Sequence, residues 1–217
     1  MADFILFDLD GTLTDSKEGI TKCVKYALGH FGIEKNEDEL ESFIGPPLKE
    51  QFMSFANLSE KEAEEAIRIY RERYIPIGIF ENKVYDGVIP LLKKLKEEGK
   101  TLAIATSKPE IFARKIADKY EFSEYMTEIK GSELDGTNTD KESVIKLAME
   151  ALGAEKENTI MVGDRAHDAI GAKKAGIVFI GVSYGYAKEG ELEGEGAKLI
   201  AKTPLKLYEI LSGSGIN

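Results

Sequence analysis

Cysteine is nearly absent from this sequence. Cys23 is the only one in 217 residues, so no disulfide can form within the chain. No stretch approaches the roughly 18 consecutive apolar residues that a membrane-spanning helix needs. The first residues also lack the basic segment and the long apolar run of a signal peptide, and we expect none there. These absences exclude a disulfide-built domain and favour a cytoplasmic protein that crosses no membrane.

Positive charge is scarce as well. The chain has 29 Lys and Arg against 39 Asp and Glu, a formal net charge of −10. Without a basic surface, neither a nucleic-acid backbone nor an anionic membrane is an expected partner. An enzyme that binds a phosphorylated metabolite would then need a metal ion or a few local cations to overcome this negative field. The hydrophobic content of 42% is ordinary for a folded soluble domain.

Short, continuous apolar runs predict strands that are buried on both sides. Between and after these runs, amphipathic stretches at about 88–95, 111–116, 144–152 and 166–175 predict helices. The runs cover residues 4–7, 102–105, 159–162 and 177–180, with weaker candidates at 125–129 and 198–201. Strands of this kind that alternate with helices form right-handed βαβ units. The sequence therefore predicts the α/β class, with a Rossmann-like parallel sheet covered by helices on both faces.

Residues 17–83 interrupt this alternation, because they contain no strand signal. An apolar stripe from Ile20 to Phe31 predicts one helix. A capping-box pattern at Ser59–Glu62 begins a longer one that runs through Tyr74. Roughly 65 residues are too many for a loop. We expect a small α-helical cap domain over 17–83, inserted after the first strand, and a core domain formed by 1–16 and 84–217.

Polar side chains gather where the predicted strands end. One of them, Lys141, lies in the first turn of a predicted helix. The start of that helix, Thr139–Glu142, matches a capping box. The set is Asp8, Asp10, Thr106, Ser107, Lys141, Asp164 and Asp168. Because the carboxyl ends of parallel strands meet at one edge of a sheet, these residues are expected to share one crevice.

Four carboxylates in one crevice cannot all ionise without a compensating charge. Oxygen ligands are those that Mg²⁺ prefers, and a lysine and a hydroxyl beside the ion would complete a site for a phosphoryl group. One carboxylate can act as the nucleophile and form an aspartyl-phosphate. A second, two residues further on, can protonate the leaving oxygen and then activate water.

The sequence resembles the haloacid-dehalogenase-like hydrolases over essentially its whole length. The residues that carry the resemblance are Asp8-Leu9-Asp10-Gly11-Thr12-Leu13-Thr14-Asp15-Ser16, Ala105-Thr106-Ser107-Lys108-Pro109, Lys141, and Gly163-Asp164 with Asp168. The helical insert resembles the C1-type cap of the phosphoglycolate-phosphatase-like and β-phosphoglucomutase-like branch. Residues 82–88 and 182–186 are also similar to segments of the phosphoglycolate-phosphatase-like members.

The resemblance implies roles for these residues. Asp8 would be the nucleophile and Asp10 the general acid and base. Thr106, with Ser107 as a neighbouring candidate, would bind phosphoryl oxygens, and Lys141 would orient and neutralise the nucleophile.

The same resemblance implies a Mg²⁺ site. The ion would be held by the carboxylate of Asp8, the backbone carbonyl of Asp10 and Asp164, with Asp168 in support. In capped relatives a loop of the cap reaches the active site. Gly45, Pro47 and Leu48 are therefore candidates for substrate selection here, and Lys49 is a candidate anchor for an anionic substrate tail.

The predicted activity is Mg²⁺-dependent hydrolysis of a small phosphomonoester, like that of phosphoglycolate phosphatases. A phosphosugar mutase is one alternative, but mutases of this family carry a His in the first cap helix, where this chain has Ile20 and no His between residues 11 and 29. A nucleotidase or pyrophosphatase of the same fold stays open. A receiver-type signalling module would lack both the helical insert and the Asp10-Gly11-Thr12 sequence after strand 1. No pattern in the sequence specifies an oligomeric state.

Overall fold

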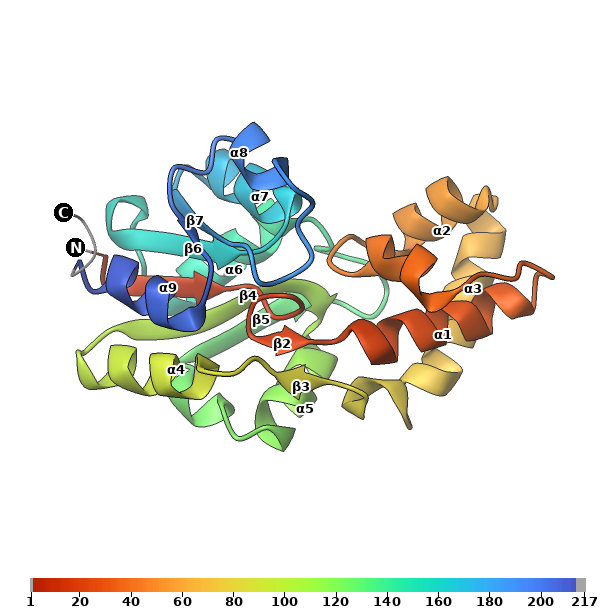
Figure 1. Cartoon of the computed structure of the whole chain (residues 1–217), viewed down its shortest axis with the longest axis horizontal. Coiled ribbons are helices and arrows are strands. Elements are labelled where there is room, and N and C mark those ends of the chain that lie inside the picture. Colours follow the sequence, from red (N-terminus) through yellow and green to blue (C-terminus); the bar gives the residue numbers. More distant parts are fainter. Residues whose placement is uncertain (1, 214–217) are drawn as a thin grey trace. The chain divides into compact units, whose positions relative to one another are not determined.

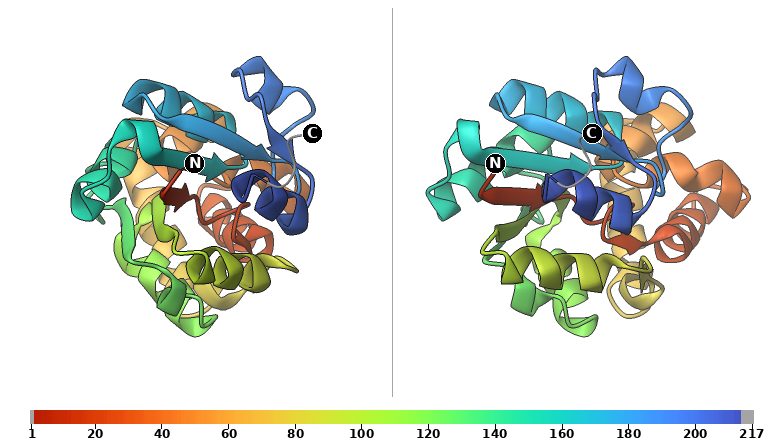
Figure 2. Two further views of the ribbon diagram at one scale, coloured as in Figure 1. Left: turned by 90° about the vertical axis from the view of Figure 1, so that its left-hand side faces the viewer. Right: turned by 60° about the vertical axis from the view of Figure 1, so that its left-hand side comes forward.

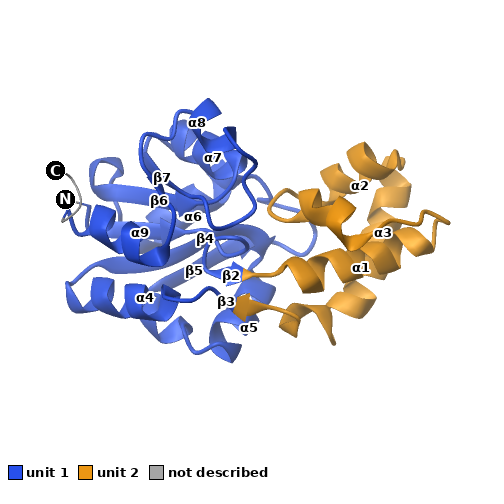
Figure 3. Ribbon diagram, viewed as in Figure 1, with its two compact units in different colours: residues 1–14, 84–217 blue, residues 15–83 orange. Residues whose placement is uncertain are grey.

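The computed structural model describes residues 2–213. Its chain divides into two compact units, one made of residues 1–14 and 84–217 and the other of residues 15–83 (Figures 1 and 3). The sequence patterns place the boundaries after residues 16 and 83. Within residues 2–213, none of the helices has the length and apolar character needed to cross a membrane.

The first unit is built on a six-stranded sheet with the strand order β5-β4-β1-β6-β7-β8. All neighbouring strands are parallel, and Phe4 of β1 lies opposite Thr101 of β4 and Thr159 of β6. The strands are β1 (Phe4–Phe7), β4 (Thr101–Pro109), β5 (Glu128–Ser132), β6 (Thr159–Gly163), β7 (Val178–Val182) and β8 (Ile200–Ala201). The predicted α/β class and parallel sheet are confirmed.

Two weak strand candidates differ from the prediction. The 125–129 candidate becomes β5, which starts at Glu128, because a 3-10 turn, η3 (Ser123–Tyr125), occupies the residues before it. The 198–201 candidate shortens to the two residues of β8. Apolar content alone does not show where hydrogen bonding to a neighbouring strand begins.

Helices cover the sheet on both faces, with α4 and α5 on one side and α6 and α7 on the other (Figure 2). Side chains on successive strand residues alternate between the faces. Leu6 belongs to one buried core cluster with Val144 and Ala148 of α6 and Ala172 of α7. The helices are α4 (Val88–Glu97), α5 (Glu110–Lys119), α6 (Lys141–Leu152), α7 (Ala166–Ala175), α8 (Glu191–Gly194) and α9 (Pro204–Leu211), with a further 3-10 turn, η4 (Lys156–Asn158).

Helix α6 begins one residue later than its sequence pattern indicates. The expected capping box from Thr139 to Glu142 is wrong, because the N-cap is Asp140, whose carboxylate accepts hydrogen bonds from the backbone N–H of Ser143 at 3.0 Å and from its hydroxyl at 2.6 Å. This start makes Lys141 the first residue of the helix, with its side chain buried.

The second unit consists mainly of helices. The capping box at the start of α3 forms as predicted, since Ser59 N–H donates to Glu62 and Glu62 N–H donates to the Ser59 hydroxyl. The elements are α1 (Lys17–Gly29), the 3-10 helix η1 (Glu37–Phe43), α2 (Leu48–Ala56), α3 (Glu60–Tyr74) and η2 (Gly78–Phe80). Two short strands, β2 (Thr14–Asp15) and β3 (Lys83–Val84), pair with each other. No sequence pattern predicted them, because two residues are too few for an alternating pattern.

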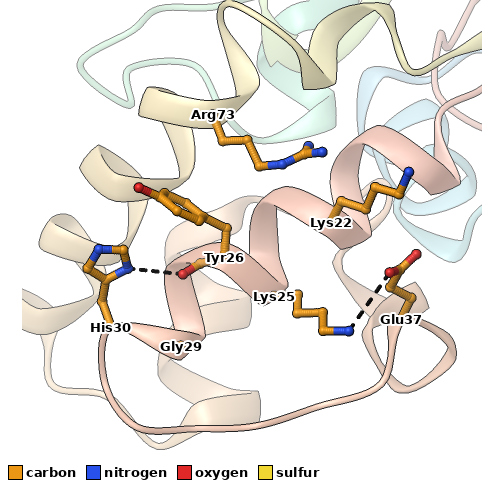
Figure 4. Close-up of a pocket in the computed structure, with 7 residues that line it drawn as sticks. All are labelled: Lys22, Lys25, Tyr26, Gly29, His30, Glu37 and Arg73. Carbon is orange, nitrogen blue, oxygen red and sulfur yellow. Dashed lines mark hydrogen bonds and ion pairs between the residues drawn. The ribbon is translucent and has the colours of Figure 1, made fainter.

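The second unit also contains an open cavity of about 610 Å³ beside α1 (Figure 4). Its lining residues are Lys22, Lys25, Tyr26, Gly29, His30, Glu37 and Arg73. Each of the three long basic side chains already has a carboxylate partner: Lys22 with Glu18 and Glu81, Lys25 with Glu37, and Arg73 with Glu81. These ion pairs offset the positive charge of the cavity.

Candidate active site

Three buried carboxylates meet at the carboxyl edge of the sheet. Asp8 follows β1, and Asp164 and Asp168 follow β6. Each offers one oxygen, and these oxygens lie within 4.8 Å of one another. The three residues are at most 3% exposed. The crevice expected from the strand ends therefore brings these three side chains together.

Lys141 lies against this cluster. Its Nζ is 2.7 Å from Oδ1 of Asp8 and 2.9 Å from Oδ1 of Asp168, and it donates a hydrogen bond to the carbonyl of Ala105. Burial by itself would lower the pKa of the ammonium, but the charges of Asp168 and Asp8 outweigh it and raise that pKa above its usual value. Lys141 is therefore a fixed positive charge that bridges two carboxylates.

A glycine on α7 makes room for this lysine. A Cβ built on Gly171 would lie 2.7 Å from the Cβ of Lys141, closer than real side chains approach. Because Gly171 has no side chain, α6 can pack closely against α7 at this point.

Asp8, Asp164 and Asp168 together carry more negative charge than Lys141 alone neutralises. Burial raises the pKa of Asp164 well above its ordinary value, and the neighbouring charges of Asp168 and Asp8 raise it further. Burial also raises the pKa of Asp168 to about 6, against the opposing effect of Lys141. A positive charge beside these oxygens would stabilise their ionised forms.

Asp164 is held in place by hydrogen bonds from one side chain and one backbone N–H. Its Oδ1 accepts a hydrogen bond from the Thr12 hydroxyl at 3.3 Å, and its Oδ2 accepts one from the Tyr186 N–H at 2.8 Å. A Cβ on Gly185 would lie 2.4 Å from the same Oδ2. The sequence of segment 182–186 is similar to family members but indicates no role for it. In the structure, this segment supplies the Tyr186 N–H that binds Asp164 and the adjacent Gly185.

Asp10 forms a second ion pair, which the sequence did not predict. Its Oδ2 lies 3.0 Å from Nζ of Lys108, and both side chains are buried. The sequence patterns show Lys108 only as part of the second motif. Asp10 follows β1 and Lys108 lies near the end of β4, so the adjacency of these two strands is the signal that could have found the pair.

The two hydroxyl candidates lie at the end of β4. Thr106 is buried, and its Oγ1 accepts a hydrogen bond from the N–H of Lys108 at 3.3 Å. Ser107 is partly buried, and its carbonyl accepts a hydrogen bond from the hydroxyl of Ser132 on β5 at 2.8 Å. The end of β4 therefore has a fixed backbone.

The candidate residues for substrate selection belong to the second unit. Gly45 has a left-handed backbone with φ +102°, Pro47 is the N-cap of α2, and Leu48 is its first residue. Lys49 lies 2.7 Å from Glu60 and 2.9 Å from Glu64 of α3, so its ammonium has two carboxylate partners within the unit.

The acidic cluster fits a hard divalent cation. All of its donors are oxygens, which suits Mg²⁺. The cluster has three carboxylates, of Asp8, Asp164 and Asp168, and the ammonium of Lys141 contacts two of them. Formally this leaves two negative charges, which one divalent ion would neutralise.

The fold and this site together define a haloacid dehalogenase-like hydrolase. The model of that family matches residues 5–182, and the chain belongs to it. Within the family the chain is a phosphatase.

Three relatives illustrate the likeness. A 5'-nucleotidase of Pseudomonas aeruginosa is 49% identical over 189 residues, which are 87% of this chain and 86% of that protein. A phosphoglycolate phosphatase of Aquifex aeolicus is 31% identical and covers 85% of this chain and 86% of its own length. The crystal structure of a predicted phosphatase from Clostridium acetobutylicum has a TM-score of 0.96 and 45% identity, covering 98% of this chain and 99% of that one.

Proposed function

We propose that this phosphatase is a Mg²⁺-dependent phosphomonoester hydrolase that acts on a small phosphorylated metabolite of the cytoplasm through an aspartyl-phosphate on Asp8. The observation that carries the proposal is the buried Asp8–Lys141 ion pair beside Asp164 and Asp168. An ammonium fixes this carboxylate at the end of a strand, next to further oxygen ligands. A carboxylate held in this way can act as the nucleophile that attacks phosphorus.

In the first step, the Asp8 carboxylate attacks phosphorus while the bond from phosphorus to the leaving oxygen breaks. Lys141 holds Asp8 in position and offsets its charge as the dianionic phosphoryl group approaches. Asp10 gives a proton to the leaving oxygen, so the product departs as an alcohol. Thr106, with Ser107 beside it, binds the phosphoryl oxygens.

In the second step, Asp10, now a carboxylate, takes a proton from a water molecule whose oxygen attacks the same phosphorus. The bond between Asp8 and phosphorus breaks, and inorganic phosphate leaves. Mg²⁺, held by the carboxylates of Asp8 and Asp164 and the backbone carbonyl of Asp10 with Asp168 in support, would neutralise charge on the phosphoryl group.

The residues above recognise only the phosphoryl group, so they do not select one monoester over another. We assign that selection to residues 17–83 acting as a cap, with Gly45, Pro47, Leu48 and Lys49 as candidates. Nucleoside 5'-monophosphates are the class to test first, because the 5'-nucleotidase shares 49% identity with this chain, against 31% for the phosphoglycolate phosphatase. Phosphoglycolate is the second.

A phosphate-release screen tests the proposal. Purified protein is given nucleoside monophosphates, phosphoglycolate, pyrophosphate and sugar phosphates, with Mg²⁺ or with a chelator. Release from at least one monoester that stops on chelation is the expected result. Activity that survives thorough chelation contradicts the metal dependence. Transfer of phosphate between positions of a sugar, with no free phosphate, would favour a mutase instead.

A further inference from the structure

Lys108 and Asp10 form an ion pair that is almost fully removed from solvent. The two charged atoms are 3.0 Å apart, and the side chains are 6% and 8% exposed. Burying two opposite charges costs much of what their attraction returns, so such a pair adds little net stability. Its presence beside a reacting group therefore points to a role in the reaction.

The backbone that carries Lys108 is held from two sides. The N–H of Lys108 donates to Oγ1 of Thr106, and the neighbouring carbonyl of Ser107 accepts the Ser132 hydroxyl. On β5, a Cβ on Gly131 would lie 2.4 Å from the carbonyl oxygen of Lys108. The lysine thus extends from the end of β4, whose position is fixed by β5.

The two oxygens of Asp10 have different surroundings. Oδ2 is the atom that faces Lys108. Oδ1 is buried and has no hydrogen-bond partner among residues 2–213. A buried polar oxygen without a partner is costly unless a ligand meets it. The ion pair therefore engages one oxygen of the carboxyl group and leaves the other for the reaction.

We propose that Lys108 is a positioning residue that orients Asp10 so that Oδ1 exchanges the proton with the leaving oxygen and then with water. This rests on the proposed function, in which Asp10 is the acid and base. Oδ1 carries the proton until the bond from phosphorus to the leaving oxygen breaks, and it takes one back from the attacking water. Lys108 keeps all of its protons and holds Oδ2 throughout.

The test uses substrates whose leaving groups differ in their need for a proton. Lys108→Met removes the charge and keeps the length of the side chain, and Lys108→Arg keeps a charge. Lys146→Met is the control, because Lys146 is paired with Glu142 on the exposed surface of α6. For each protein, kcat/KM is measured on an alkyl phosphate and on aryl phosphates of graded phenol acidity, and inhibition by inorganic phosphate is measured in parallel.

We expect Lys108→Met to lower kcat/KM for the alkyl phosphate about tenfold more than for the most activated aryl phosphate, because only the former needs the proton. Lys108→Arg should restore part of that difference, and Lys146→Met should show none. Inhibition by phosphate should stay within about threefold of the parent value. Equal losses on all substrates with weaker phosphate inhibition would overturn the proposal and make Lys108 a ligand of the phosphoryl group.

A double variant separates this inference from the function on which it rests. If Lys108 acts through Asp10, Lys108→Met should cost nothing further in an Asp10→Asn background. Additive losses would refute the positioning role while leaving the acid–base role of Asp10 intact. If Asp10→Asn itself loses the same factor on every substrate, the acid–base role fails, and the inference fails with it.

Discussion

Gly11 lies directly against the carboxylate of Asp164. A Cβ built on Gly11 would be 2.1 Å from Oδ2 of Asp164, and the backbone there has φ +83°, in the left-handed region that favours glycine. Two independent constraints therefore require glycine at this position. One is conformational, and the other is the space that the candidate metal ligand occupies.

Replacing this glycine should damage the metal site. In Gly11→Ala the added methyl group must displace Asp164, and we expect a loss of roughly 10–100-fold in Mg²⁺ affinity or activity. Titration of activity with Mg²⁺ measures it. Gly99→Ala is the matched control, since Gly99 has φ +80° but no atom within 4 Å of the place that a Cβ would take. It should lose about 1 kcal/mol of stability from backbone strain and keep its Mg²⁺ response. Similar Mg²⁺ responses in both variants would mean that Asp164 is not a ligand.

Asp8→Asn should abolish turnover and spare the fold. The amide cannot attack phosphorus, and we expect a rate loss of at least about 10⁴, on the order of 5.5 kcal/mol of barrier. Lys141 keeps Asp168 as a partner at 2.9 Å, so the lysine is not left buried without a counter-charge. Single-turnover phosphate release and thermal unfolding measure the two effects. Asp118→Asn, at an exposed position on α5, is the control. A beryllium fluoride adduct found on a residue other than Asp8 would disprove the assignment.

The acidic cluster should link metal binding to pH. The pKa of Asp168 is about 6 in the folded protein against an ordinary value of 3.8, and that of Asp164 is raised as well. A carboxyl group whose pKa rises on folding binds its proton more tightly in the folded state. Its contribution therefore lowers the stability of the metal-free protein as pH rises from about 4 to about 6.

Mg²⁺ should reverse this loss, because it competes with protons for the same oxygens. We expect the increase in Tm on adding Mg²⁺ to be larger at pH 7.5 than at pH 5. Calorimetry at the two pH values, with and without Mg²⁺, measures it. At each pH, the Tm with Mg²⁺ is compared with the Tm without it. The titration of distant groups such as Asp140, whose pKa is lowered, cancels in this difference. A Tm increase that is the same at both pH values would show that these carboxylates do not bind the ion.

The sequence could predict the edge of the sheet where the polar groups meet, because that edge follows from strand direction alone. Once β1, β4 and β6 are parallel neighbours, Asp8 and Asp164 must end up on the same side of the molecule. The choice of Lys141 as the lysine of this site came from its place in the first turn of a helix and from the family resemblance.

One ion pair of the site was out of reach of the sequence. The family resemblance implied that Lys141 neutralises Asp8, but nothing in the sequence indicated that Lys108 pairs with Asp10, because this depends on how far each side chain reaches across neighbouring strands. The N-cap of α6 is similar: Thr139 and Asp140 are both good caps. Packing decides between them, because the cap at Asp140 sets the turn of the helix that buries Lys141.

Lys49 offers a test of substrate selection. Its ammonium is bound by Glu60 and Glu64 on α3. If it also attracts the anionic tail of a substrate, Lys49→Ala should lower kcat/KM about tenfold for acid-tailed substrates such as phosphoglycolate and much less for neutral-tailed ones. The double variant Glu60→Gln, Glu64→Gln keeps the lysine and removes its competing partners, so it should shift the preference the opposite way, toward acid-tailed substrates. Both variants are measured over one substrate panel, and inhibition by free phosphate should stay unchanged. Loss of folding alone does not shift the substrate preference in opposite directions in the two variants. Equal losses over the whole panel in both would mean that Lys49 serves only the packing of α2 on α3, and that selection lies elsewhere in residues 17–83.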